Sequence, residues 1–304
     1  MSSAPQHVAV DPPPPPDTTP PSRAKPLIPF VLLIATVLVP TLFWFRNSFA
    51  RELDDARLEA YLSRNATATE SQHGLTDLSR RIEAERRGAK PKDKPATAFY
   101  GQLANLASAD GADGVEKRKS AAWVMQYDPT SDVFRTALLK LVADPEPLVA
   151  WNAATSLARH GSAAARPRLL EMLSTYEIRA RHEGVFEADA RLEETLGTGS
   201  GSRLGTIKTS AGVVEVLSPV LGRVMALPAD GKTAAVGDVL AKLAPSQAAG
   251  MNALAALALP GIGLPEDVAA IEEFLRLNPS LEPQVAKQAR IVIAALRGDH
   301  PASR

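Results

Sequence analysis

The chain of 304 residues contains no cysteine, which excludes disulfides, thiolate metal sites and cysteine nucleophiles. It also has no net charge, because 34 basic residues balance 34 acidic ones. Proteins that bind nucleic acid usually show a net positive field or a basic stripe with interleaved aromatics, and this sequence has neither. We therefore expect no nucleic-acid partner.

Motifs for catalysis and metal binding are missing too. The histidines are scattered without metal-ligand spacing, at His7, His73, His160, His182 and His300. No P-loop, G-x-S-x-G or H-E-x-x-H occurs, and the glycine-rich run 197–202 is read as a linker. Adjacent carboxylates at Glu193-Glu194 and Glu272-Glu273 point in different directions on a helix, which suits solvated faces. We expect a non-enzyme without catalytic, cofactor-binding or metal-binding residues.

Two unusual segments open the chain. Residues 1–26 are rich in proline and poor in large apolar side chains, which predicts a disordered tail or, alternatively, a polyproline ligand. Residues 27–45 are nineteen uncharged residues, and a helix of that length spans about 28 Å, close to the thickness of a bilayer core. We expect a transmembrane helix there. The alternative is a cleaved signal peptide, since Ser48-Phe49-Ala50 offers a cleavage site.

Residues 46–95 are highly charged. Leucines and an isoleucine nevertheless repeat at helical spacing, at Leu53, Leu58, Leu62, Leu75, Leu78 and Ile82. Because no heptad pattern is sustained, we interpret the segment as a solvated helical stalk. The run 88–95, GAKPKDKP, is the linker that ends it.

Residues 130–173 predict three amphipathic helices. The first places Phe134, Leu138, Leu141 and Val142 on one face, behind cap candidates at 130–132. The second has proline in its first turn and a glycine just past its end, and its face is formed by Val149, Ala153 and Leu157 between Pro147 and Gly161. The third carries Leu169, Leu170 and Leu173.

The spacing D-P-x-P-x-V-x-x-x-A-A-x-x-L-x-x-x-G in this stretch resembles a HEAT repeat of the kind found in phycobilisome-lyase-like proteins. One departure is Ala150, where members of that family usually carry arginine. Partial copies of the pattern occur at 96–129, 251–261 and 282–286. About three repeats are needed to bury a continuous core, so we predict HEAT-like helices over 96–177 that continue over 247–298.

The segment between them, 178–246, is then an insertion. We expect it to begin with a charged helical piece at 187–196, followed by the glycine linker and four short strands over 205–245. The order Ser218-Pro219-Val220-x-Gly222-Arg223-Val224, followed by Gly237-Asp238-Val239-Leu240, resembles half of a biotinyl/lipoyl domain. More closely, it is similar to the first half-motif in membrane-fusion (periplasmic adaptor) proteins. Gly222 would allow two strands to approach closely, and Gly237-Asp238 favours a turn.

Two departures limit this resemblance. Carrier domains place the lysine that receives biotin or lipoate seven residues after the leucine, where this chain has Gln247, so we expect no such cofactor. No second half-motif follows, so a sandwich would have to close in a different way.

Together these patterns predict a mainly α fold, in which HEAT-like helices carry an inserted lipoyl-like β-hairpin module behind one transmembrane helix. The expected function is a membrane-anchored, non-catalytic scaffold for an unidentified protein partner, in an envelope transport or secretion complex. The alternatives are a divergent efflux or secretion adaptor and, disfavoured by Gln247, a biotin- or lipoyl-type carrier. The charges that flank 27–45 nearly balance. The adaptor resemblance therefore decides the expected localisation, a single-pass membrane protein with its folded part in the periplasm. Trp151 is expected in the core, with a partner-binding anchor as the alternative.

Overall fold

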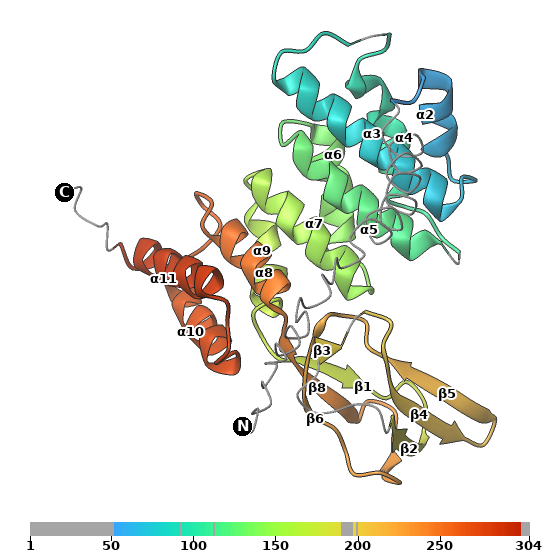
Figure 1. The fold of residues 1–304 in the computed structure, drawn as a ribbon, viewed down its shortest axis with the longest axis vertical. Helices are drawn as coiled ribbons and strands as arrows, with labels where there is room; N and C mark the ends of the chain where they lie inside the picture. The colour runs from blue at the N-terminus through green and yellow to red at the C-terminus, as the bar shows by residue number, and fades with distance from the viewer. Residues whose placement is uncertain (1–51, 92, 112, 190–196, 199, 299–304) are drawn as a thin grey trace, which may run out of the picture. The chain divides into compact units, whose positions relative to one another are not determined.

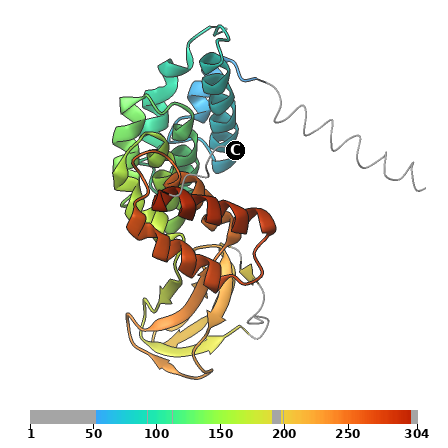
Figure 2. The same ribbon diagram turned by 90° about the vertical axis from the view of Figure 1, so that its left-hand side faces the viewer.

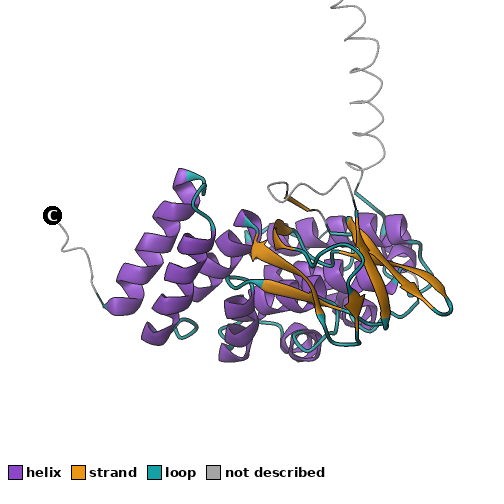
Figure 3. Cartoon of the chain, turned by 90° about the horizontal axis from the view of Figure 1, so that it is seen from below, coloured by secondary structure: helices purple, strands orange, loops and turns teal. Residues whose placement is uncertain are grey.

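The computed structural model describes residues 52–91, 93–111, 113–189, 197–198 and 200–298. The proline-rich segment 1–26 and the apolar segment 27–45 lie outside the described residues. In the part that is described, about half of the chain is helical, and eight strands form two antiparallel sheets (Figures 1 and 3). The fold is therefore mixed α/β, and the mainly α class that we expected is wrong.

Helices come first along the chain. They are α2 (Asp55–Tyr61), α3 (Ala68–Arg86), α4 (Tyr100–Leu106), α5 (Gly114–Val124), α6 (Asp132–Leu141), α7 (Pro147–Arg159) and α8 (Arg166–Glu171). Three more follow the sheets: α9 (Gln247–Leu257), α10 (Val268–Leu277) and α11 (Pro283–Arg297). Short 3-10 turns lie at Ala96–Phe99, Met125–Tyr127, Ala163–Ala165 and Pro265–Asp267.

The three helices predicted in 130–173 are confirmed as α6, α7 and α8. Ser131 caps α6 by accepting a hydrogen bond from the Phe134 amide, and Pro147 is the first residue of α7. Gly161 follows α7 with a φ of +71°, the left-handed conformation that favours glycine at this position. The apolar faces of α6 and α7 are buried as their spacing predicted, with Val149, Ala153 and Leu157 wholly inaccessible on α7.

The charged segment after residue 51 differs from the solvated stalk that we expected. The side chains with helical spacing on α2 and α3 are buried in the same apolar core as the later helices, including Leu58, Leu75 and Ile82. Arg81 of α3 bonds to Asp55 at 2.6 Å and to Asp77 at 2.9 Å, and its guanidinium lies 5.6 Å from the centre of the Phe99 ring. These paired charges allow a strongly charged sequence to pack as part of a helical layer.

The strands follow α8 and form two four-stranded sheets. Their bounds are β1 (Tyr176–Arg179), β2 (Gly184–Ala188), β3 (Gly197–Thr198), β4 (Arg203–Thr209), β5 (Gly212–Leu217), β6 (Gly222–Ala226), β7 (Thr233–Ala234) and β8 (Val239–Pro245). One sheet has the order β1-β8-β6-β3 and the other β5-β4-β2-β7. The expected helical piece at 187–196 is wrong at its start, since Glu187 and Ala188 belong to β2, and 190–196 lie outside the described residues.

The glycines of the lipoyl-like pattern have the roles that we predicted for them. A Cβ added to Gly222 would lie 2.7 Å from the carbonyl oxygen of Ala244 on the neighbouring strand β8, so only glycine permits this approach. Gly237 has a φ of +93° in the turn before β8, and the Asp238 carboxylate accepts a hydrogen bond from the Ala235 amide across that turn.

After the strands, the chain returns to the helices. α9 packs against α7 and α8, and α11 packs against α9 and α10 (Figures 1 and 2). Arg166 at the start of α8 bonds to the buried carboxylate of Asp267, just before α10. The strands are thus inserted, along the sequence, between helices that contact one another.

The expected localisation in a membrane, with a single pass and a periplasmic folded part, is contradicted by the structure. None of the helices in the described residues is both long and apolar enough to cross a bilayer.

The burial of α7 predicts the effect of truncating one leucine. Leu157→Ala should lower the free energy of unfolding by about 2 to 5 kcal/mol, because it removes a fully buried side chain and leaves a cavity. The matched control is Leu139→Ala on α6, where the side chain is 46% exposed and the change should stay within about 0.5 kcal/mol. Urea unfolding followed by circular dichroism measures both values, and equal effects of the two variants would contradict this packing.

Two helical glycines predict opposite outcomes for the same substitution. A Cβ on Gly250 of α9 would lie 2.2 Å from the ring of Phe274, so Gly250→Ala should destabilise the fold. Gly101 of α4 has no atom within 4 Å of such a Cβ, so Gly101→Ala should stabilise it by up to about 1 kcal/mol. The melting temperatures of the two variants should therefore move in opposite directions, and a shared direction would refute the packing of α9 on α10.

Candidate functional site

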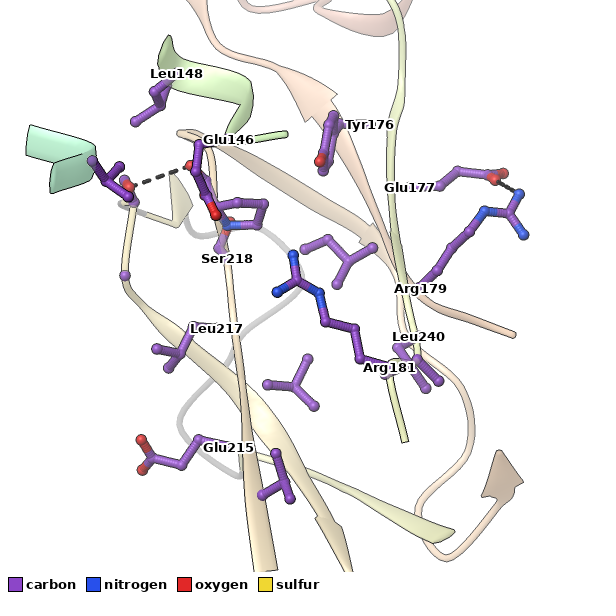
Figure 4. Close-up of a pocket in the computed structure, with 18 of the residues that line it drawn as sticks. Glu146, Leu148, Tyr176, Glu177, Arg179, Arg181, Glu215, Leu217, Ser218 and Leu240 are labelled. Atoms are coloured by element: carbon purple, nitrogen blue, oxygen red, sulfur yellow. Dashed lines mark hydrogen bonds and ion pairs between the residues drawn. The ribbon is translucent and has the colours of Figure 1, made fainter. Parts of the chain in front are cut away.

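A cleft of about 740 Å³ lies where the two sheets meet the helical layer (Figure 4). Three walls enclose it. The first is formed by α5 and the start of α7, the second by β1 and the residues after it, and the third by β5 and the residues after it. The side chains therefore come from parts of the chain that are far apart in sequence.

Both strand walls are the edges of sheets. Among the residues that the structure describes, β1 pairs only with β8 and β5 pairs only with β4. An edge strand directs every second set of backbone N–H and C=O groups away from its neighbour, where a further strand can pair with them. The cleft is thus open along two strand edges at once.

The floor of the cleft is apolar. Four buried aliphatic side chains line the cleft: Ile178 of β1, Ile207 of β4, Val216 of β5 and Leu240 of β8. They alternate along their strands with outward polar residues such as Arg179 and Lys208, as in the inner face of a sandwich. A ligand that enters the cleft would remove apolar surface from water.

An aromatic pair closes the cleft beside α7. The rings of Tyr176 and Trp151 meet edge to face, with centroids 6.0 Å apart at an angle of 88°. Trp151 is only 5% exposed, which confirms its place in the core rather than on an open surface. Burial, together with the nearby negative charge of Glu171, raises the pKa of the Tyr176 hydroxyl above its ordinary value.

Most charged groups around the cleft neutralise one another. Glu177 bonds to Arg179 and, at 3.0 Å, to Lys242. On the helical wall Glu116 lies 2.6 Å from Lys119, and on β5 Glu215 lies 3.5 Å from Arg203 outside the cleft. These pairs leave little net charge on the walls.

Arg181 differs from them. It follows β1 after a register shift between Ile178 and Arg179, and its guanidinium extends into the cleft, towards the side that holds Glu146 and Ser218 (Figure 4). It forms no hydrogen bond or ion pair with any residue that the structure describes. An uncompensated guanidinium above an apolar floor favours a carboxylate or another planar anion.

The histidines and adjacent carboxylates for which the sequence indicated no catalytic or metal-binding role do not gather at one site in the described structure. His160 bonds through Nε2 to the carbonyl oxygen of Met125, while His182 lines the cleft. Glu272 pairs with Arg297 and Glu273 with Arg276. Residues 7, 193, 194 and 300 lie outside the described residues. Among those described, no three His, Asp or Glu side chains gather as a metal site would require.

Gln247 begins α9, and its side-chain oxygen accepts a hydrogen bond from the Glu282 amide. It therefore lies at a helix start and not in a turn between strands, where a carrier domain would present its lysine.

The cleft itself was missed at the level of sequence. We expected no strand before residue 205, although Tyr176-Glu177-Ile178-Arg179 alternates apolar and polar side chains as an edge strand does. That alternation was a usable signal for β1. Arg181 had none, because only the tertiary structure brings it into one cleft with residues of α5, α7 and β5.

Comparisons with known proteins leave the site to be interpreted from its own geometry. No model of a protein family matches the chain, and no similar chain is found among curated proteins or among solved structures.

The buried hydroxyl of Tyr176 predicts a titration that can be measured. The difference in tyrosinate absorbance between the unaltered chain and Tyr176→Phe should show a midpoint above pH 10, the ordinary range for this group. Because the pKa is raised in the folded state, the neutral hydroxyl contributes stability below pH 10 that is lost as the pH rises through the folded pKa. A midpoint at or below pH 10, with the circular dichroism of the native fold retained, would contradict the burial of this hydroxyl.

Proposed function

We propose that this chain is a non-catalytic scaffold that binds a segment of a protein partner in the cleft between β1, β5 and the helices. One observation carries the proposal. Two edge strands, each with one neighbour among the described strands, face a cleft whose floor is formed by buried aliphatic side chains. Sites of this kind bind extended peptide, because the strand edges supply backbone pairing and the floor supplies apolar contact.

The helical layer supports the proposal as a rigid frame. α7 and α11 both begin with a Glu-Pro pair, after which the apolar face of each helix is buried at Val149 and Val285. α9 ends in front of Gly261, whose φ of +76° matches the +71° of Gly161 after α7. These recurrences favour stacked helical repeats of HEAT type, which commonly act as scaffolds for partners.

The strand order supports a sandwich of biotinyl/lipoyl type. Exchanging each strand of the first four with the strand four places later, so that β1 exchanges with β5 and β4 with β8, converts the order β1-β8-β6-β3 of one sheet into the order β5-β4-β2-β7 of the other. The first four strands and the last four therefore occupy equivalent places in the two sheets. This order favours a sandwich of two interleaved halves. In such a sandwich, the strands that precede the half-motif take the place of a second half-motif after it.

The proposal does not include a carrier role. Gln247 stands where a carrier domain would present lysine, and its side-chain oxygen is engaged with the Glu282 amide.

Site-specific crosslinking tests the scaffold proposal. A photoreactive phenylalanine is placed at Val214 on the β5 wall or at Leu148 on the α7 wall, both half-buried residues that line the cleft. We expect both positions to crosslink to one segment of one protein in the native cells, as located by mass spectrometry of the adduct. The matched control is Ile291 on α11, which is 51% exposed and does not line the cleft. Adducts from Ile291 alone, or none from either wall, would contradict the proposal.

A further inference from the structure

We infer that the β5 edge pairs with one extended segment of the partner, in antiparallel or parallel orientation. Apolar and polar side chains alternate along this segment, and one carboxylate lies opposite Arg181. This inference rests on the proposed scaffold function and names the chemistry of what the cleft holds.

The β5 edge is unusually apolar for a strand without a second neighbour. Val213 is 64% exposed and Leu217 is 46% exposed, and the single charged residue of the strand is Glu215. Native proteins usually protect an edge strand with charges, proline or a covering segment, because unpaired backbone groups next to apolar side chains attract another strand. β5 has little of this protection in the described structure, which favours a strand as its natural neighbour.

The hairpin of β4 and β5 determines which backbone groups of β5 can pair with a further strand. Thr209 and Gly212 pair across a two-residue loop, and the ladder continues with Val213, Val214 and Glu215 in regular register. In an antiparallel ladder, pairs that exchange hydrogen bonds alternate with pairs that do not. The pair that closes a two-residue loop is of the bonded kind, so Val214 faces β4 with its backbone groups while Val213 and Glu215 face outward. A strand added to β5 would pair with these outward groups.

The floor sets the side chains that such a strand should carry. Every second side chain of an added strand would point inward, over Val214, Val216 and Ile178. Val216 and Ile178 are buried, and Val214 is half-buried at the rim, so an apolar side chain at these inward positions would extend the existing core. The six residues of β5 correspond to a paired segment of about 20 Å.

Arg181 favours one charged residue among the otherwise apolar inward side chains of the added strand. Its guanidinium extends into the cleft and bonds to none of the described residues, whereas the carboxylates of Glu116, Glu177 and Glu215 already have basic partners (Figure 4). Arg181 is exposed in the free chain, and a segment bound over it would remove its guanidinium from water, which costs free energy unless a carboxylate of that segment pairs with it. Glu146 on the helical wall forms no ion pair with another described residue, and the Arg181 guanidinium extends towards its side of the cleft, so a bound carboxylate should approach the guanidinium from the side away from Glu146.

Binding of synthetic peptides to the full chain tests the inference. The probe is a fluorescein-labelled peptide of ten residues that alternates threonine and valine, with glutamate replacing one valine; four versions place the glutamate at successive valines. Fluorescence anisotropy should show saturable binding of at least one version. Arg181→Gln should weaken that version about tenfold, equivalent to about 1.4 kcal/mol, and should leave the matching glutamine peptide unchanged. The control is Arg57→Gln, which makes the same change of charge on an exposed arginine of α2.

The backbone pairing has its own pair of variants. Glu215→Pro removes an outward N–H from an edge strand, a position that tolerates proline, and should abolish binding of every version. Glu215→Gln removes the same charge but keeps the N–H and should bind normally. If Glu215→Pro fails to fold, a peptide methylated on alternate backbone nitrogens tests the same pairing on the unaltered chain and should not bind.

Several results would overturn the inference. The first is that none of the four peptide versions binds. The second is that Glu215→Pro binds peptide as well as the unaltered chain does, or that the methylated peptide binds as well as the unmethylated one. The third is that Arg181→Gln weakens binding of the glutamate and glutamine peptides equally. A dimer in solution that Glu215→Pro dissociates would assign the edge to a second copy of the chain and would also overturn it. Crosslinks from Val214 and Leu148 to one partner segment would then still support the scaffold, so the two failures can be told apart.

Discussion

The contact between Arg166 and Asp267 is the constraint on which the rest of the structure depends. The Asp267 carboxylate is only 1% exposed and would be costly to bury alone. It accepts hydrogen bonds from the Arg166 guanidinium at 2.6 to 3.0 Å and from the Leu264 amide at 2.9 Å, so its oxygens are well satisfied. This contact joins residues 101 positions apart and holds the returning chain against α8.

The position of the sandwich follows from that return. β1 leaves the helical layer just after α8, and β8 re-enters it at α9, which packs on α7 and α8. β1 and β8 pair with each other, and Arg223 of β6 donates a hydrogen bond to the carbonyl oxygen of Leu277 at the end of α10. Because both ends of the insertion are fixed at the helices, its β1 and β5 edges face α5 and the start of α7 and enclose the cleft.

The resulting site combines pairing capacity with very little free charge. Its ion pairs lie within one element, as between Glu116 and Lys119, or between neighbouring strands, as between Glu177 and Lys242, and such surface pairs add little to stability. The exceptions are Arg181 and Glu146, which form no ion pair with another described residue. One uncompensated cation over an apolar floor is enough to distinguish a segment that carries a carboxylate from one that does not.

The sequence by itself determined the elements whose formation depends on neighbours along the chain. The bounds of α6 and α7 follow from Ser131, Pro147 and Gly161, because caps and the 3.6-residue period act within one or two turns. The close approach at Gly222 and the turn at Gly237 were also predictable, since each depends on the absence of one side chain.

Only the tertiary structure decided which surfaces are buried and which edges stay open. The charged sequence of α3 indicated a solvated helix, yet Arg81 is paired with Asp55 and Asp77 and the leucines beside it enter the core. Likewise, the short strands β1 and β2 gained their partners from residues more than twenty positions away, at Leu243 and Lys208. The physical reason is the same in each case: pairing of charges and of strands across long sequence separations depends on the return of the chain, which no local pattern encodes.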